Sequence, residues 1–181
     1  MKRCSWVNLN NPLYVKYHDK EWGKPKYNDH DLFELLILEM YQAGLSWECI
    51  LNKRDNFRVA FDNFDYEKIS NYNEKKIMDL LNNPGIIRNK LKINATINNA
   101  KIFMNIKNEY GSFANFIWSF TNNNIIKGIH KTSNELSDQV SNVLKQKGMK
   151  FVGSTIIYSY LQAIGVINDH DEDCDWRVCK N

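Results

Sequence analysis

The clearest indication of the fold is the stretch Leu80-Leu81-Asn82-Asn83-Pro84-Gly85-Ile86-Ile87-Arg88-Asn89-Lys90. Apolar residues on both sides predict helices, and the Pro-Gly pair predicts a turn between them. Such a turn can present backbone N–H groups and the positive end of the second helix to a phosphate, and Arg88, Lys90 and Lys92 add positive charge. The stretch therefore indicates either a helix-hairpin-helix that binds DNA phosphates or an ordinary corner between two helices with a solvated basic face.

Apolar residues recur at helical spacing on both sides of this hairpin. The pattern predicts helices over about 31–42, 46–61, 73–81, 88–108, 113–120, 132–148 and 154–164. Strict two-residue alternation, which a sheet would need, is nearly absent, and no repeat or flexible linker divides the 181 residues. We therefore expect an all-α fold in a single domain over residues 1–181.

The composition narrows the class of protein. The net charge of +3 favours a polyanionic partner only mildly, so a role with nucleic acid must depend on local basic clusters. No apolar run approaches the roughly 20 residues that a membrane span requires, and no charged leader precedes one. Four scattered cysteines do not suggest a disulfide framework. We expect a cytoplasmic protein that does not contact a membrane.

Cysteine and histidine pairs near the two ends of the chain suggest a metal site. One pair, Cys4 and His18, bounds the segment 4–18, and the other, His170 and Cys174, bounds 170–174. Two thiolates and two imidazoles form a closed tetrahedral set, which is typical of structural zinc. The interval of four residues in the second pair places both side chains on one face of a helical turn. Spacing alone leaves chance placement as an equal alternative.

One acidic residue in an apolar run suggests a ligand pocket. Glu39 lies within the segment 35–40, where a charge is costly unless it is paired or binds a ligand. Trp47 begins the next helix beyond the Gly44 turn, so the two side chains can converge on one cleft. A carboxylate beside a flat aromatic ring suits a planar, electron-poor heterocycle. The alternatives are that Glu39 turns outward to water and that the aromatic residues are ordinary core.

Six segments of the chain match one known family. In order they are Arg3-Cys4-Ser5-Trp6-Val7, Asp19-Lys20-Glu21-Trp22-Gly23, Gln42-Ala43-Gly44-Leu45-Ser46-Trp47, Phe116-Ile117-Trp118-Ser119-Phe120, Phe151-Val152-Gly153 and Asn168-Asp169-His170. In these segments the chain resembles the 3-methyladenine DNA glycosylase I family, the constitutive bacterial enzymes of alkylation repair. The resemblance covers nearly the whole chain. It implies a helix-hairpin-helix DNA glycosylase fold, with the hairpin element at about 73–108. It also implies a structural zinc that joins the N- and C-terminal segments through Cys4, His18, His170 and Cys174.

The resemblance also implies a function in DNA base-excision repair. The enzyme would flip 3-methyladenine out of alkylated double-stranded DNA and hydrolyse its N-glycosidic bond, leaving an abasic site without lyase activity. It would act as a monomer in the bacterial cytoplasm, with the chromosome. Glu39 would contact the flipped base as the catalytic residue. The residues implied to bind the base are Trp6, Tyr14, Tyr17 and Trp47, and those implied to contact DNA are Gly44, Leu45, Gly85, Arg88 and Lys90.

Two other functions are compatible with parts of the sequence, and two features of the sequence need comment beside the family pattern. A zinc-stapled domain could bind damaged DNA without cleaving it, and a catalytic metallohydrolase is disfavoured because four protein ligands close the metal site. Other helix-hairpin-helix glycosylases place an aspartate about twenty residues beyond the hairpin, whereas the nearest acid here is Glu109, which we expect on a surface loop. Cys179 could compete as a metal ligand, but only Cys174 has the His-x-x-x-Cys interval of the family.

Overall fold

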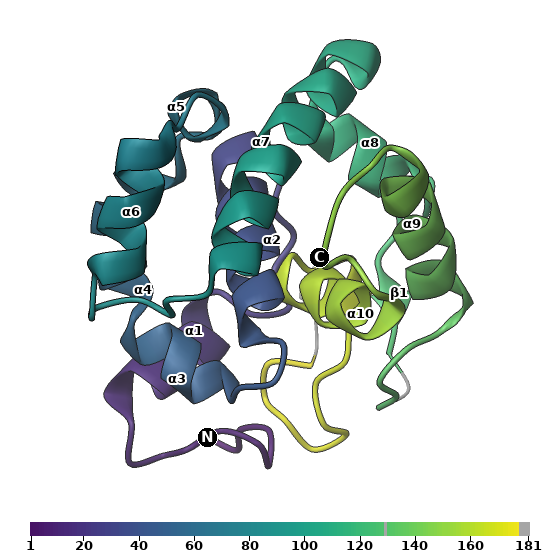
Figure 1. Ribbon diagram of the computed structural model, residues 1–181. Helices are drawn as coiled ribbons and strands as arrows, with labels where there is room; N and C mark the ends of the chain where they lie inside the picture. The colour runs from purple at the N-terminus through teal and green to yellow at the C-terminus, as the bar shows by residue number, and fades with distance from the viewer. Residues whose placement is uncertain (129, 178–181) are drawn as a thin grey trace.

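The computed structural model describes residues 1–128 and 130–177, and most of them are helical (Figure 1). The α-helices are α1 Pro12–Lys20, α2 Asp29–Gln42, α3 Trp47–Asn52, α4 Arg54–Ala60, α5 Tyr66–Ser70, α6 Glu74–Asn82, α7 Lys90–Tyr110, α8 Phe113–Ser119, α9 Glu135–Gln146 and α10 Ser154–Ala163. A 3-10 turn spans Asp62–Phe64. The expectation of a mainly helical chain is confirmed. The strict all-α prediction misses two short strands, β1 Ile126–Lys127 and β2 Ile167–Asn168, which pair in parallel.

Helix α2 lies at the centre of the fold. The Asn28 side chain caps its start by accepting hydrogen bonds from the amides of His30 and Asp31. Every residue from 32 to 41 is buried, so α2 is enclosed on all sides rather than along one stripe. It packs against α3, α7, α8 and α10. This position places Glu39, near the end of α2, in the interior of the protein.

The helix predicted over 46–61 is wrong in one respect, because it divides at Lys53 into α3 and α4. The break turns Arg54 inward. Its Nε donates to Glu34 on α2 over 2.6 Å, and its Nη1 donates to Glu21 over 2.7 Å. Because these partners are distant in the sequence, the local spacing of apolar residues does not predict the break at Lys53.

Helices α6 and α7 form the predicted hairpin, with boundaries close to those expected. Helix α6 ends at Asn82, and the side chain of Asn89 caps α7 by accepting from the Lys92 amide over 3.1 Å. Ile86 is buried between the two helices, while Arg88 and Lys90 are exposed. Glu109 lies in the last turn of α7, so the expectation of a loop position for it is wrong.

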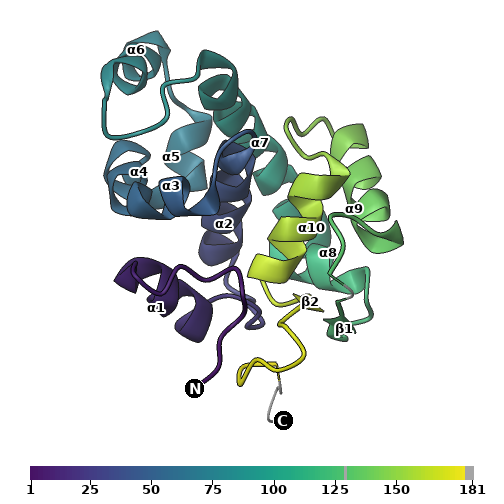
Figure 2. The same ribbon diagram turned by 90° about the horizontal axis from the view of Figure 1, so that it is seen from below.

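The two ends of the described chain lie side by side (Figure 2). The Asp175 amide donates to the Lys2 carbonyl over 2.9 Å, and the Ser5 amide donates to Asp171 Oδ2 over 2.6 Å. Among the described residues, no helix is both long and apolar enough to cross a membrane. Cys179 lies outside the described residues.

Candidate active site and metal centre

Helix α1 carries residues for two neighbouring sites. Asn11 caps its start, and Pro12 occupies its first position, where a missing N–H costs nothing. Tyr14, Tyr17 and His18 stand three and four residues apart, so they share one inward face of the helix. The two tyrosines face a cavity, and His18 faces a cluster of cysteine and histidine side chains.

The cavity has a volume of about 330 Å³ and brings together the five residues that the sequence predicted for a base pocket. They are Trp6, Tyr14, Tyr17, Glu39 and Trp47. The rings of Tyr17 and Trp47 lie with their centroids 5.0 Å apart, and those of Trp6 and Tyr14 lie 5.6 Å apart. The result is a chamber with aromatic walls and one acidic side chain, of a size suited to a small planar ligand.

Glu39 is the acidic group of this chamber, and it is only 4% exposed. Burial raises the pKa of its carboxyl group to about 8. Within the described chain, its Oε2 atom has no hydrogen-bond partner, and neither has Nε1 of Trp47. Buried polar atoms without partners are rare and costly. Two of them in one cavity indicate that a ligand supplies their partners.

The tyrosines beside Glu39 stay protonated at neutral pH. Burial raises the pKa of Tyr17, and the nearby Glu39 carboxylate reinforces the shift. Burial likewise raises the pKa of Tyr14, with smaller contributions from Glu48 and Glu39. Both phenol groups are therefore available as hydrogen-bond donors at the cavity wall.

The sequence did not predict the polar part of the cavity wall. Its residues are Gln42, His130, Lys131, Ser159, Gln162 and Asp169. Asp169 holds this wall together, because it accepts hydrogen bonds from the His130 amide over 2.9 Å, from the Tyr158 hydroxyl over 2.9 Å and from Gln162 Nε2 over 2.7 Å. The only hint in the sequence was the motif Asn168-Asp169-His170, which also contains a predicted metal ligand.

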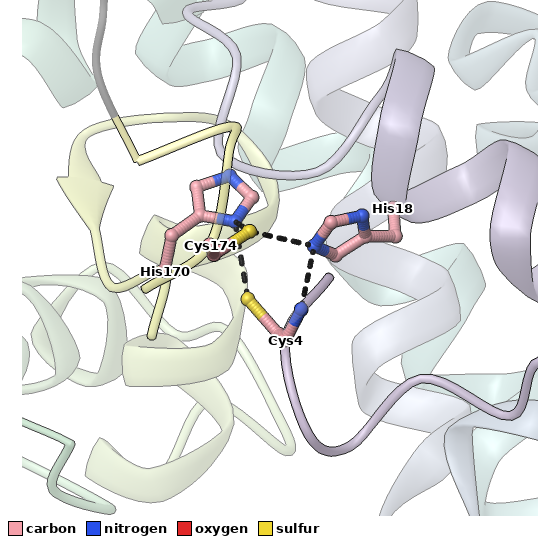
Figure 3. Close-up of side chains that lie close together, drawn as sticks. All are labelled: Cys4, His18, His170 and Cys174. Atoms are coloured by element: carbon pink, nitrogen blue, oxygen red, sulfur yellow. Dashed lines mark hydrogen bonds between the residues drawn. The ribbon is translucent and has the colours of Figure 1, made fainter. Parts of the chain in front are cut away.

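The predicted metal ligands come together in one buried cluster (Figure 3). One ligand atom from each of Cys4, His18, His170 and Cys174 lies within 4.8 Å of the others. Cys4 Sγ is 3.2 Å from His170 Nδ1, and Cys174 Sγ is 3.5 Å from His18 Nε2. The side chains of the two chain ends point toward a common centre.

The cluster has the donors and spacing of a tetrahedral metal site. Zinc bonds of about 2.0–2.3 Å place tetrahedral ligand atoms roughly 3.3–3.8 Å apart, close to the sulfur–nitrogen distances found here. Burial lowers the pKa of His170 to about 4, so its imidazole is neutral and can ligate. On the other side of His18, Nδ1 lies 2.8 Å from Asp19, which Arg3 holds in turn with two hydrogen bonds of 2.8 Å. A carboxylate behind a ligating histidine is typical of metal sites.

Two tryptophans connect the cluster with the cavity. Trp6 and Trp22 line the cavity, and their ring centroids lie 4.8 Å apart. On their other side, Trp6 packs against His18 at 5.3 Å and Trp22 packs against His170 at 4.7 Å. One wall of the cavity therefore rests directly on the cluster.

The predicted DNA-contacting residues occupy two exposed turns. Gly44 follows α2 with a φ of +83°, a left-handed conformation that favours glycine, and Leu45 beside it is 41% exposed. In the other turn, the Gly85 amide already donates to Asn83 Oδ1 over 2.8 Å, so it is engaged within the protein. Arg88 and Lys90 are exposed beside it. Contact of these residues with DNA stays a prediction.

Lys92 does not belong to the solvent-facing basic surface expected from the sequence. It is buried, and its Nζ donates to the carbonyl oxygens of Tyr41 over 2.9 Å and Ala43 over 2.8 Å. These carbonyls end α2, where a cation is favoured by the helix dipole. Lys92 therefore anchors the turn that contains Gly44 and Leu45, and it holds this turn against the first turn of α7.

Replacing Lys92 with Met is expected to lower the free energy of unfolding by about 2 kcal/mol, because two buried carbonyls lose a charged donor. Lys92→Arg should recover part of the loss. Lys101→Met, on the exposed face of the same helix, is the matched control. Denaturant unfolding checks this prediction, and equal stability of Lys92→Met and Lys101→Met would contradict the role of Lys92.

Comparison with known proteins gives matches over nearly the full chain. A family model described as methyladenine glycosylase matches residues 6–178. The DNA-3-methyladenine glycosylase 1 of Escherichia coli (strain K12) is 42% identical over an alignment of 181 positions that covers 96% of each chain. A crystal structure of 3-methyladenine DNA glycosylase I matches with a TM-score of 0.93 at 42% identity, covering 97% of this chain and 99% of the other. The 3-methyladenine DNA glycosylase I of Staphylococcus aureus matches with a TM-score of 0.94 at 35% identity, over 100% and 99% of the two chains.

Proposed function

The chain belongs to the methyladenine glycosylase family, and we propose that its aromatic cavity receives a 3-methyladenine base flipped out of duplex DNA. The protein is a DNA-3-methyladenine glycosylase of base-excision repair, which hydrolyses the bond between the damaged base and its sugar. The main support for this role of the cavity is Glu39. Its carboxylate is buried between aromatic walls, and within the described chain its Oε2 atom has no hydrogen-bond partner.

Glu39 recognises the base through its exocyclic amino group. A 3-methyladenine nucleotide carries positive charge, and its amino group can donate a hydrogen bond to an ionised carboxylate. A methylated guanine presents a carbonyl oxygen at the same position, which would face the carboxylate acceptor and cost a buried hydrogen bond. Trp47 offers its ring face to the base, and Tyr17 offers a hydroxyl donor.

The chemistry requires little acid catalysis. A base that already carries positive charge is a good leaving group, so extrusion of the nucleotide and its recognition provide most of the selectivity. Glu109, the nearest acid beyond the hairpin, does not line the cavity and instead pairs with Lys147 over 2.6 Å, which fits an enzyme that needs no aspartate at that point of the chain. Lys131 lines the polar wall of the cavity, but a cationic base leaves without a covalent enzyme intermediate, and we propose a monofunctional enzyme that leaves an abasic site.

The cysteine and histidine cluster binds a structural zinc in this proposal. Cys4, His18, His170 and Cys174 would fill all four positions, so the metal would hold α1 and the chain ends in place without touching the base. The supporting observations are the donor set, the spacing of its atoms and the Asp19 carboxylate behind His18.

The hairpin of α6 and α7 acts as a helix-hairpin-helix in this proposal. Arg88 and Lys90 are exposed at the start of α7, where the helix dipole also favours a phosphate. The turn with Gly44 and Leu45 would approach the gap that the flipped base leaves in the DNA, and Gly85 would allow the backbone to approach DNA. Phosphate contacts of this kind position the enzyme without reading sequence. We further propose that the protein works as one domain, as a monomer, in the bacterial cytoplasm.

Incubation with methylated duplex DNA tests this function. We expect free 3-methyladenine in solution and DNA that breaks only after alkali treatment, because an abasic site is left intact by a monofunctional enzyme. A domain that only binds damage would retain the DNA and release no base. That outcome would contradict the proposed reaction.

A further inference from the structure

Phe151, between α9 and α10, has a backbone conformation that large side chains rarely adopt. Its φ is +56°, in the left-handed region. The chain is fixed on both sides of it. The Lys150 amide donates to Asn99 Oδ1 over 2.8 Å, Asn99 Nδ2 donates to the Lys150 carbonyl over 2.9 Å, and Ser141 Oγ donates to the Val152 carbonyl over 2.6 Å. Strain that the surroundings hold in this way is often found at functional positions.

Phe151 lines a shallow groove along the first half of α7, which we call the Phe151 groove. Its volume is about 490 Å³, and its lining residues are Leu91, Asn94, Ala95, Asn98, Lys150 and Phe151. The Phe151 side chain is 36% exposed and that of Leu91 is 70% exposed. The strained backbone therefore supports an aromatic ring that remains in contact with solvent.

The charge of the groove favours an anionic partner. Its lining includes the cation Lys150 and no carboxylate. At its other end, Leu91 follows Lys90 directly in α7, and Arg88 stands two residues before Lys90. Figure 2 shows the turn between α9 and α10 on the same side of the molecule as the turn between α6 and α7. The groove thus continues the exposed basic surface of the hairpin.

We propose that the Phe151 groove binds the backbone of duplex DNA beside the lesion. Phe151 and Leu91 contact deoxyribose, whose carbon atoms suit apolar side chains, and Lys150 contacts a phosphate. Bound DNA would thereby be held at two points, the hairpin turn and this groove along the first half of α7. This inference rests on the proposed function, because it extends the surface on which that function places DNA.

The test uses Phe151→Asn, because asparagine adopts left-handed backbone readily and removes the ring. We expect the variant to bind a duplex with a stable abasic-site analogue about tenfold more weakly, with free 3-methyladenine bound as tightly as by wild type. Its melting temperature should stay at or above that of wild type. Lys150→Gln should lower the salt dependence of duplex binding by about one phosphate contact.

Ile125→Asn provides the matched control, since it removes an exposed apolar side chain that directly precedes β1 and does not line the groove. The groove contact would be overturned if Phe151→Asn, Ile125→Asn and wild type all bound the duplex with equal affinity. In that case, excision of 3-methyladenine by wild type would still support the proposed function. If wild type formed a dimer and Phe151→Asn were monomeric, the groove would be a self-association surface. This result would also overturn the proposed DNA contact. Failure of wild type itself to release 3-methyladenine would instead contradict the proposed function.

Discussion

Replacing Glu39 with Gln is expected to reduce the excision of 3-methyladenine roughly 10- to 100-fold, because a charge-assisted hydrogen bond is replaced by a neutral one. Gln has nearly the same shape, so the aromatic walls should remain in place. The rate of base release under single-turnover conditions measures this effect. In wild type, the rate should rise as the pH passes through about 8 and level off above it, as the carboxyl group with its raised pKa ionises. In Glu39→Gln this rise should be absent.

The same substitution should make the protein more stable at alkaline pH. The pKa of Glu39 is raised from 4.5 to about 8 in the folded state, so the protonated group favours folding and this contribution is lost as pH rises through 8. The full shift corresponds to a stability change on the order of 5 kcal/mol. Denaturant unfolding at pH 5, 7 and 9 should therefore show wild type losing stability relative to Glu39→Gln.

The two measurements separate function from folding. Excision at the wild-type rate by Glu39→Gln, with its metal content intact, would contradict the assigned role of the carboxylate. A parallel fall in stability of both proteins between pH 5 and 9 would show that Glu39 is not the buried group that titrates. A gain in stability together with a loss of activity is the usual consequence of removing a buried functional charge.

Replacing Cys4 with Ser is expected to release the metal and lower the melting temperature by roughly 8–16 °C. A ligand present at 1,000 times its dissociation constant stabilises a folded protein by about 4 kcal/mol, and for a chain of this size each kcal/mol corresponds to about 2–4 °C. Elemental analysis and thermal unfolding measure the two effects. Base release should fall as well, because His18 shares α1 with Tyr14 and Tyr17.

Cys49→Ser is the control for this prediction, since Cys49 lies on α3 outside the metal cluster. It should retain one zinc per chain and the wild-type melting temperature. Asp19→Asn should weaken metal binding about 10- to 100-fold by removing the carboxylate behind His18. Unchanged metal content and stability in Cys4→Ser would refute the structural role of the cluster.

Features that depend on neighbouring residues in the sequence could be predicted. The turn at Pro84-Gly85 has local signals and occurs where expected. His170 and Cys174 come together as their spacing suggested, but through a non-helical turn in which the Cys174 amide donates to the Asp171 carbonyl, so the helical turn expected there is wrong. Glu39 was marked by its place in an apolar run, and the structure confirms its burial. Each of these inferences uses only turn residues, short sequence spacing or the cost of burying a charge.

Features that depend on distant contacts could not be predicted from one sequence. His130 joins the cavity wall because β1 pairs with β2 and Asp169 accepts from its amide, yet strands of two residues leave no periodic pattern. Lys92 looked like part of a basic surface because its acceptors, at the end of α2, are about 50 residues away. The groove beside Phe151 likewise depends on a loop that α7 holds from a distance.

The central claim is that a buried carboxylate selects the adenine amino group in an aromatic cavity. The most direct test is to treat DNA that contains 3-methyladenine, 3-methylguanine and 7-methylguanine, and to separate the released bases by chromatography. Wild type should release 3-methyladenine at least roughly tenfold faster than either methylated guanine, since each guanine presents a carbonyl oxygen to the Glu39 carboxylate. Equal release of the three bases would contradict the account.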